Sequence, residues 1–249
     1  MYAIISDIHG NLEALLAVLD DIKKRNITEI ICLGDIIGYG PNPKECIDIA
    51  LDFQTCILGN HDEAALFESE AAFFNDKARA AIEWTRQQLE DYSDAQNNGA
   101  RWDFLCGLPR KHQLDDILMV HGSPRKPVKE YIFPDIIITP NRLDKLFELI
   151  DHTCFVGHTH IPGVITEDRE YKSPAGLGNV YEITGKKAVI NFGSVGQPRD
   201  GINTAAYGCF DGTKAFFCRV PYDIAIVQHK IYAIGALDNE LGDRLAEGR

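Results

Sequence analysis

The stretch YAIISDIHGNLEALLAVLDDIKKRNITEIICLGD, residues 2–35, decides the fold class. It opens with a short apolar run that stops at Asp7, and a second apolar run, EIICLG, ends at Asp35. Between them, apolar residues recur at the spacing of one helix face, at Leu12, Leu15, Leu16, Leu19 and Ile22. The order strand, helix, strand predicts two parallel strands joined by a crossover helix.

The same alternation continues beyond this stretch. Residues 41–52, PNPKECIDIALD, predict a helix with Pro43 near its start, and TCILG predicts a third strand that ends at Asn60. Later strands are expected at DDILMVHG, which ends near His121, and at TCFVGH, which ends at His158. Strands that alternate with helices in this way predict an α/β fold with a parallel sheet covered on both faces.

The rest of the chain divides into a helical part and a β-rich part. Residues 63–107 look helical, and another helix is expected from Thr139-Pro140. From about residue 163 we expect strands at GVIT, NVYEIT, KKAVINFGSV, TAAYGCFD, KAFFCRV and IAIVQHKIY. Because no repeat, linker or low-complexity tract interrupts the chain, we expect one domain over residues 1–249 with a helical insert at about 63–110.

Composition narrows the class of protein. A formal net charge of -12 disfavours sustained nucleic-acid binding, since a uniformly acidic surface repels polyanions. No apolar segment approaches the ~20 residues that cross a bilayer, so no membrane association is expected. The start of the chain does not resemble a signal peptide, and the 7 cysteines lack close pairs. These features predict a cytoplasmic protein with reduced thiols.

Polar side chains follow the predicted strands at the point where each one ends. Asp7, Asp35, Asn60, His121 and His158 occupy these positions. Ligands of open α/β sheets bind beyond the carboxyl ends of the strands, so these side chains are expected to meet at one rim. Each residue alone has an ordinary alternative, such as a helix cap for an aspartate or a buried structural histidine.

Two local spacings suggest how the rim residues divide their work. In Asp7-Ile8-His9, extended backbone would point the two polar side chains the same way, so that both can bind one cation. Asn60 and His61 are adjacent and would point apart. If the neutral Asn60 oxygen binds a metal, His61 is left free to move a proton.

A charge count favours two metal ions and an anionic substrate. The candidate ligands are Asp7, His9, Asp35, Asn60, His121, His158 and His160. Only two of these are anionic, so two divalent ions would leave a surplus of about two positive charges. Mixed nitrogen and oxygen ligands suit Mn, Fe, Zn, Ni or Co better than Ca or Mg, and Mn is the ion we expect to work in vitro.

The order of these motifs resembles the calcineurin-like metallophosphoesterase superfamily. The five blocks stand here as SDIHG, LGDIIGYG, LGNHDE, VHGSP and VGHTH, and they span residues 7–160. The resemblance implies a four-layer α/β/β/α sandwich, in which two packed mixed sheets are flanked by helices and the β-rich C-terminal third supplies much of the second sheet. Five blocks in the family's order are a specific match, whereas any one of them would be weak.

The resemblance also implies a role for each motif residue. Asp7, His9 and His160 would hold one metal ion, and Asn60, His121 and His158 would hold the other, with Asp35 bridging both. A metal-bridging hydroxide would attack the phosphorus of a phosphate ester, and His61 would protonate the leaving group. Asp62 would orient and charge His61.

Departures from the family's protein phosphatases narrow the expected substrate. In those enzymes an arginine follows the G-D aspartate, but this chain reads GDIIGYGPNP and has Asp62 where they usually have glutamate. The stretches GDIIGYGPNP and NFGSVGQPRDG look like small prokaryotic members, among which phosphodiesterases and dinucleoside-polyphosphate hydrolases occur. Arg199 and Tyr39 are candidate substrate contacts, although Arg199 could equally pair with Asp200 and Tyr39 could pack in a loop.

Three functions are therefore weighed. The first is a dinuclear metal-dependent phosphoesterase that acts on a small phosphodiester or nucleotide-type substrate. The second is a phosphomonoesterase, including a protein serine/threonine phosphatase, and the third is a non-catalytic protein-binding scaffold. The intact His61 and the complete ligand set argue against the scaffold. Exposed sheet edges leave a homodimer open, and aromatic residues of the insert could form a lid or simply pack.

Overall fold

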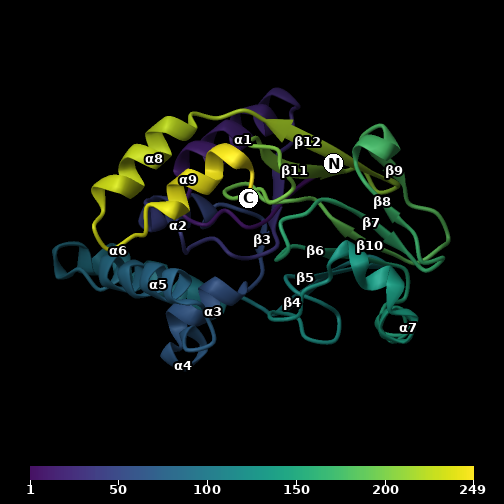
Figure 1. The fold of residues 1–249 in the computed structure, drawn as a ribbon, viewed down its shortest axis with the longest axis horizontal. Coiled ribbons are helices and arrows are strands. Elements are labelled where there is room, and N and C mark those ends of the chain that lie inside the picture. The colour runs from purple at the N-terminus through teal and green to yellow at the C-terminus, as the bar shows by residue number, and fades with distance from the viewer.

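Two six-stranded β-sheets pack face to face, and helices cover their outer faces (Figure 1). The computed structural model describes all 249 residues. Sheet A has the strand order β3 (Thr55–Cys56), β2 (Glu29–Cys32), β1 (Tyr2–Ile5), β11 (Ala205–Phe210), β12 (Lys214–Val220) and β9 (Val180–Glu182). Sheet B has the order β4 (Lys111–Leu114), β5 (Ile117–Val120), β6 (Thr153–Val156), β10 (Ala188–Asn191), β7 (Gly163–Thr166) and β8 (Tyr171–Lys172). The expected α/β/β/α sandwich is confirmed.

Each sheet contains a parallel part, which sends its carboxyl ends toward one rim. In sheet A, β1, β2 and β3 are parallel, with Ile4 opposite Ile31, while β11 runs antiparallel to β1. In sheet B, β5, β6 and β10 are parallel. The polar residues that follow β1, β2, β3, β5 and β6 are therefore delivered to the same region.

The two sheets are held together by an apolar layer between their inner faces. The Phe155 ring lies at its centre and meets Phe192 edge to face at 5.0 Å and Phe210 at 5.4 Å between ring centroids. All three rings are buried. Edge-to-face pairs add to the free energy gained from burying the rings, so this layer fixes the distance between the two halves of the rim.

Two sets of helices cover the outer faces. Sheet A is covered by α1 (Leu12–Lys24), α2 (Pro43–Ala50) and the helical insert, which contains α3 (Asn60–Leu66), α4 (Glu68–Ala71), α5 (Asp76–Leu89), η1 (Tyr92–Asp94) and α6 (Ala95–Gly107). Sheet B is covered by η2 (Pro134–Ile138) and α7 (Pro140–Phe147). The short η3 (Ala175–Leu177) lies between β8 and β9. α1 begins where the predicted periodicity begins, because the Asn11 side chain accepts a hydrogen bond from the Ala14 amide.

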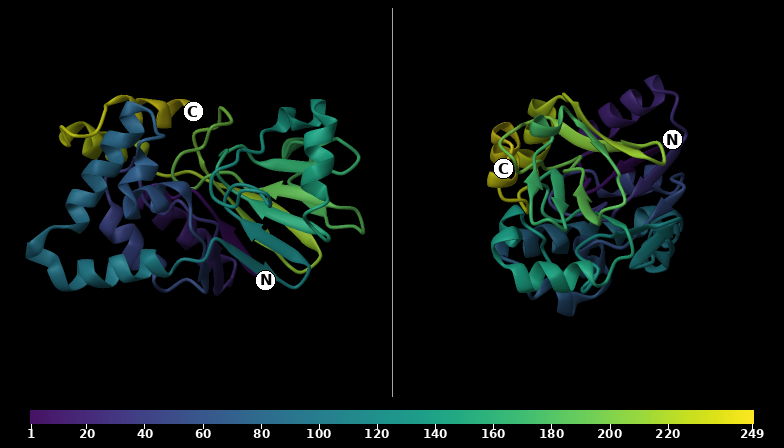
Figure 2. Two further views of the ribbon diagram at one scale, coloured as in Figure 1. Left: turned by 90° about the horizontal axis from the view of Figure 1, so that it is seen from below. Right: turned by 90° about the vertical axis from the view of Figure 1, so that its right-hand side faces the viewer.

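The C-terminal segment differs from the expectation. IAIVQHKIY was expected as a strand, but it forms α8 (Ile224–Ala233), because Asp223 caps its first turn and Val227 and Ile231 lie on one buried face. A further helix, α9 (Glu240–Glu247), packs against it. Figure 2 shows both helices in yellow on the same side of the molecule as the blue helical insert, which they contact through Ala81 and Trp84.

The β-rich final third supplies much of the second sheet, as expected, and it also completes the first. β7, β8 and β10 join sheet B, whereas β9, β11 and β12 complete sheet A. The reason is that β11 pairs with the free edge of β1 through an antiparallel ladder, which sequence periodicity does not specify. None of the helices is long and apolar enough to cross a membrane.

Candidate metal centre

The loops that follow the strands adopt a left-handed backbone where they meet. Six residues at this rim have a positive backbone angle φ, between 50° and 66°, namely Asp7, His9, Asp35, Tyr39, His158 and His160. Such conformations are costly for residues other than glycine and are concentrated at functional sites. Asp7 and His9 were expected on extended backbone, but both have a left-handed conformation. The chain turns twice here because Asp7 and His9 donate backbone hydrogen bonds to the carbonyls of Gly34 and Asp35.

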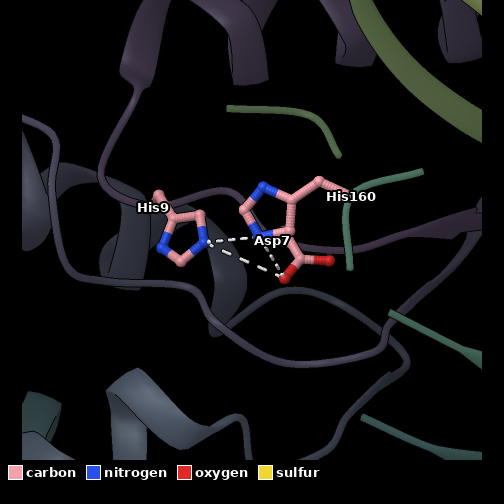
Figure 3. A group of neighbouring side chains, drawn as sticks. All are labelled: Asp7, His9 and His160. Carbon is pink, nitrogen blue, oxygen red and sulfur yellow. Dashed lines mark hydrogen bonds and ion pairs between the residues drawn. The ribbon is translucent and has the colours of Figure 1, made fainter. Parts of the chain in front are cut away.

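One group of ligand-type atoms is formed by Asp7, His9 and His160 (Figure 3). Asp7 Oδ1 lies 3.1 Å from His160 Nε2 and 3.8 Å from His9 Nε2. The two histidine Nε2 atoms are 3.2 Å apart. All three side chains are buried, so these atoms converge on one small space away from bulk water.

A second group is formed by Asp35, His121 and His158, with Asn60 beside it. His121 Nε2 lies 3.3 Å from Asp35 Oδ2, 3.2 Å from His158 Nδ1 and 3.0 Å from Asn60 Oδ1. Asp35 Oδ2 is also 3.7 Å from His9 Nε2, so this carboxylate stands between the two groups. All seven predicted ligand residues are brought together.

Gly59 explains why Asp35 can lie so close to the next loop. A Cβ atom on residue 59 would be 2.1 Å from Asp35 Oδ1, a distance that no real contact shows. The same carboxylate oxygen accepts a hydrogen bond of 2.8 Å from the His61 amide. The glycine of the LGNHDE motif therefore serves close packing of two loops.

The far nitrogen of each histidine ring faces a backbone carbonyl. The acceptors are Ile37 for His9 (3.2 Å), Leu33 for His121 (2.9 Å), Gln197 for His160 (2.6 Å) and Lys129 for His158 (3.4 Å). A carbonyl can only accept, so the far nitrogens carry the hydrogen and the inner nitrogens present lone pairs. Two such lone pairs 3.2 Å apart repel unless a cation or proton lies between them. The donor set therefore fits bound divalent transition metals.

The pKa values of the aspartates and of His121 also indicate that this site favours bound positive charge. Burial raises the pKa of Asp7 and Asp35, but the adjacent His160 and His121 outweigh it and hold both carboxyl pKa values below their usual range. Burial lowers the pKa of His121, yet Asp35 reverses the effect and raises it to about 9. Without a metal ion, a proton on His121 thus supplies part of the missing charge.

His61 borders the centre and keeps one ring atom free. Its ring centroid lies 4.7 Å from that of His9, 4.4 Å from Tyr39 and 4.7 Å from Phe74. The buried Nδ1 atom has no hydrogen-bond partner. Burial lowers the pKa of His61 to about 4, with only partial compensation from Asp35.

Asp62 was expected to orient His61, but its carboxylate forms no hydrogen bond with the His61 ring. Its carboxylate accepts four backbone hydrogen bonds, from Gly59 (3.0 Å), Asp35 (2.8 Å), Ile36 (3.0 Å) and Ile37 (3.3 Å). These amides belong to the loops that follow β2 and β3. The contact with His61 is absent because the carboxylate is turned away into this cradle, where it fixes the loop that carries Asp35.

A cavity of about 310 Å³ opens beside the second group. Its lining consists of Asn60, Glu63, Glu70, Phe73, Phe74, Lys129, Tyr131 and His158. The Tyr131 ring stacks on His158, with 3.6 Å between centroids and 16° between planes, and the Phe73 side chain is 83% exposed. The cavity therefore combines three aromatic side chains and two candidate ligands with the charged Glu63, Glu70 and Lys129. Sequence reasoning did not find Tyr131, because no motif marks it.

The comparisons with known proteins decide the family. A family model for the calcineurin-like phosphoesterase superfamily domain matches residues 1–214. The chain belongs to this superfamily. A metallophosphoesterase from Sphaerobacter thermophilus is 36% identical, with a TM-score of 0.81 and coverage of 100% of this chain and 98% of that one. Together these findings identify a metal-dependent hydrolase of phosphate esters.

Two further similar proteins extend along the full chain. An uncharacterized protein from Methanocaldococcus jannaschii is 41% identical over 257 residues, covering 100% of this chain and 98% of that protein. A hypothetical protein from Pyrococcus horikoshii, 22% identical, shares the fold with a TM-score of 0.75 over 100% of this chain and 99% of that one. In this calcineurin-like phosphoesterase, α8 and α9 lie beyond the residues that the family model matches.

Proposed function

We propose that this phosphoesterase uses two metal ions and acts on a phosphodiester or nucleotide-type substrate. The observation that carries the proposal is the paired arrangement of ring nitrogens, with two inner nitrogens 3.2 Å apart in each group and Asp35 between the groups. One cation for each pair relieves the repulsion of both. The net positive charge of such a centre suits an anionic phosphate.

Each ligand residue has a place in this proposal. Asp7, His9 and His160 would hold one ion, Asn60, His121 and His158 would hold the other, and Asp35 lies between the two groups. When bound, the ions supply Lewis-acid stabilisation of phosphate charge and lower the pKa of water. Mn is the ion we expect to support activity in vitro. The far-nitrogen hydrogen bonds of the four histidines fix their tautomers and keep the ligand atoms pointing inward.

His61 is proposed to deliver a proton to the leaving-group oxygen. Its ring lies at the edge of the centre, and its Nδ1 atom has no partner in the protein. Burial lowers the pKa of His61 to about 4, and the negative charge of a bound phosphate would act in the opposite direction and favour the protonated ring. Asp62 acts indirectly, by holding the loop of Asp35.

The aromatic cavity supports a substrate with a flat group. Phe73, Phe74 and Tyr131 present ring faces or edges next to Asn60 and His158. Aromatic walls favour a nucleobase or another planar group over a plain alkyl chain, because stacking adds to burial.

A substrate panel tests the proposal. The protein is loaded with Mn²⁺, its metal content is measured, and hydrolysis is compared for a phosphomonoester, a phosphodiester and a dinucleoside polyphosphate. We expect turnover of the last two, with a lower KM for substrates that carry a nucleobase. A protein that holds both metals and hydrolyses none of the three would instead be a binding scaffold.

A further inference from the structure

Two arginines approach the same aromatic ring at the edge of the candidate centre. The guanidinium carbon of Arg199 lies 5.9 Å from the Tyr39 ring centroid, and that of Arg244 lies 4.6 Å from it. The Tyr39 ring in turn lies 4.7 Å from His9 and 4.4 Å from His61. Both cations therefore stand one side chain away from the proposed metal ligands.

Neither guanidinium has an acidic partner. Arg199 donates only to the neutral side-chain oxygen of Gln197, at 2.7 and 3.2 Å. Arg244 Nε and Nη2 are buried and have no acceptor at all. Burial lowers the pKa of Arg244 and the nearby Arg199 charge lowers it further, while Tyr39 and Glu240 offset part of this effect. By contrast, the buried Arg101 is neutralised by Asp48 and Asp94.

This arrangement is unfavourable unless an anion completes it. Buried donors without acceptors and two like charges close together each cost free energy. A phosphate group offers several oxygens and at least one negative charge, and a planar guanidinium binds such oxygens in pairs. The scissile phosphate is already accounted for by the metal ligands, so the two arginines are left for another group.

We propose that Arg199 and Arg244 form a subsite for a second phosphate group of the substrate. The inference rests on the proposed function and narrows it to esters with at least two phosphates, such as nucleoside polyphosphates. Tyr39 contacts His9 of the first ligand group, whereas the aromatic cavity borders Asn60 and His158 in the second. A bound substrate then spans the centre, with its planar group on one side and its second phosphate on the other.

The position of Arg244 makes this a feature of the C-terminal helices. Arg244 lies on α9, beyond the residues 1–214 that the family model matches. Leu241 and Leu245 on the same helix are buried against α8, which fixes the orientation of the helix. The helix pair therefore supplies specificity from outside the matched domain. The sequence did not indicate a role for Arg244, because this residue is about 200 positions away from Tyr39, which it contacts.

The test compares the binding of one phosphate with that of two. Dissociation constants for inorganic phosphate and inorganic pyrophosphate are measured by calorimetry on metal-loaded protein dialysed free of excess metal. The variants are Arg199→Gln, Arg244→Gln and Arg244→Lys, with Arg249→Gln as a matched control because Arg249 is exposed at the chain end. Metal content is measured for each.

We expect the wild type to prefer pyrophosphate, and each glutamine variant to reduce that preference about 10- to 100-fold, as the loss of charge-assisted hydrogen bonds predicts. Arg244→Lys keeps the positive charge but not the paired donors of the guanidinium, so it should lose less of the preference for pyrophosphate. It also keeps the test informative if Arg244→Gln does not fold. Arg249→Gln keeps the preference. An unchanged preference, or equal weakening for both anions, would overturn the subsite. Wild-type turnover of an ester with one phosphate tests the proposed function separately.

Discussion

At the scale of single residues, the hydrogen bonds of the histidine rings determine which nitrogen atoms face the candidate metal centre. Each candidate ligand histidine directs its far ring nitrogen at a backbone carbonyl, so the inner nitrogen is the one that can offer a lone pair to a metal ion. Asp7 and Asp35 remain charged in the same buried space. The residues are thus arranged for cations, and the two residues next to them, His61 and Asp62, have separable tasks.

The task of His61 predicts a defect that depends on the leaving group. His61→Asn is expected to keep its metal ions but to lower kcat on an alkyl phosphate ester about 10²- to 10⁴-fold, because a poor leaving group needs a proton. An ester with a nitrophenolate leaving group should lose much less. His229→Asn, at an exposed position on α8, serves as the control. Equal losses on both esters would rule out proton donation.

The task of Asp62 predicts a structural defect instead. Asp62→Asn replaces one acceptor oxygen by a donor that faces backbone amides. We expect the free energy of unfolding to fall by about 1.5–3 kcal/mol and metal affinity to fall about 10- to 100-fold. Urea unfolding and metal titration measure the two effects, with the exposed Asp116→Asn as the reference. Unaltered metal affinity would contradict this role.

At the scale of elements, the segment after β5 supports both the metal centre and the cavity. Glu130 accepts hydrogen bonds from Ser123 (2.5 Å), Arg125 (3.0 Å) and Arg142 (3.0 Å). The neighbouring Lys129 carbonyl and the Tyr131 ring hold His158. Burial raises the pKa of Glu130, but its arginine and serine partners outweigh this effect and lower it to about 2.

This carboxylate predicts a defined pH dependence of stability. A lowered pKa means that its contribution is complete above the unfolded value of 4.5 and is lost as the pH falls through about 2. Glu130→Gln should reduce the free energy of unfolding by about 1.5–3 kcal/mol at pH 7, and the difference from wild type should shrink below pH 4.5. Glu148→Gln, an exposed position, should show neither effect. A difference that persists at pH 2 would contradict the assignment.

The same scale shows what the sequence could predict. Apolar runs that end in Asp, Asn or His identified β1, β2, β3, β5 and β6 and the rim that they share. Periodicity misread α8, because its apolar residues cover most of the helix and resemble a buried strand. The left-handed backbone at Asp7 and His9 depends on hydrogen bonds to residues 34 and 35. Such partners, like the Arg244 contact with Tyr39, appear only once the chain is folded.

At the scale of the whole molecule, the layer between the sheets sets the distance between the residues that each sheet contributes to a ligand group, such as Asp7 after β1 and His160 after β6. Phe155→Ala is expected to lower the free energy of unfolding by about 3–5 kcal/mol, because the cavity it leaves lies between packed rings. Phe73→Ala removes the same side chain from an 83% exposed position and should change it by less than about 0.5 kcal/mol. Similar costs for the two changes, measured by urea unfolding, would contradict this description of the core.

Two metal ions are proposed to bind at the rim where the loops of both sheets meet, one to each ligand group. This proposal is tested most directly by measuring metal equivalents per chain, by mass spectrometry, after reconstitution with Mn²⁺ and removal of free metal. We expect two equivalents for the wild type, and one each for His160→Ala and His121→Ala, because each substitution removes a ligand of a different ion. A wild type that holds a single equivalent, or none, would contradict it.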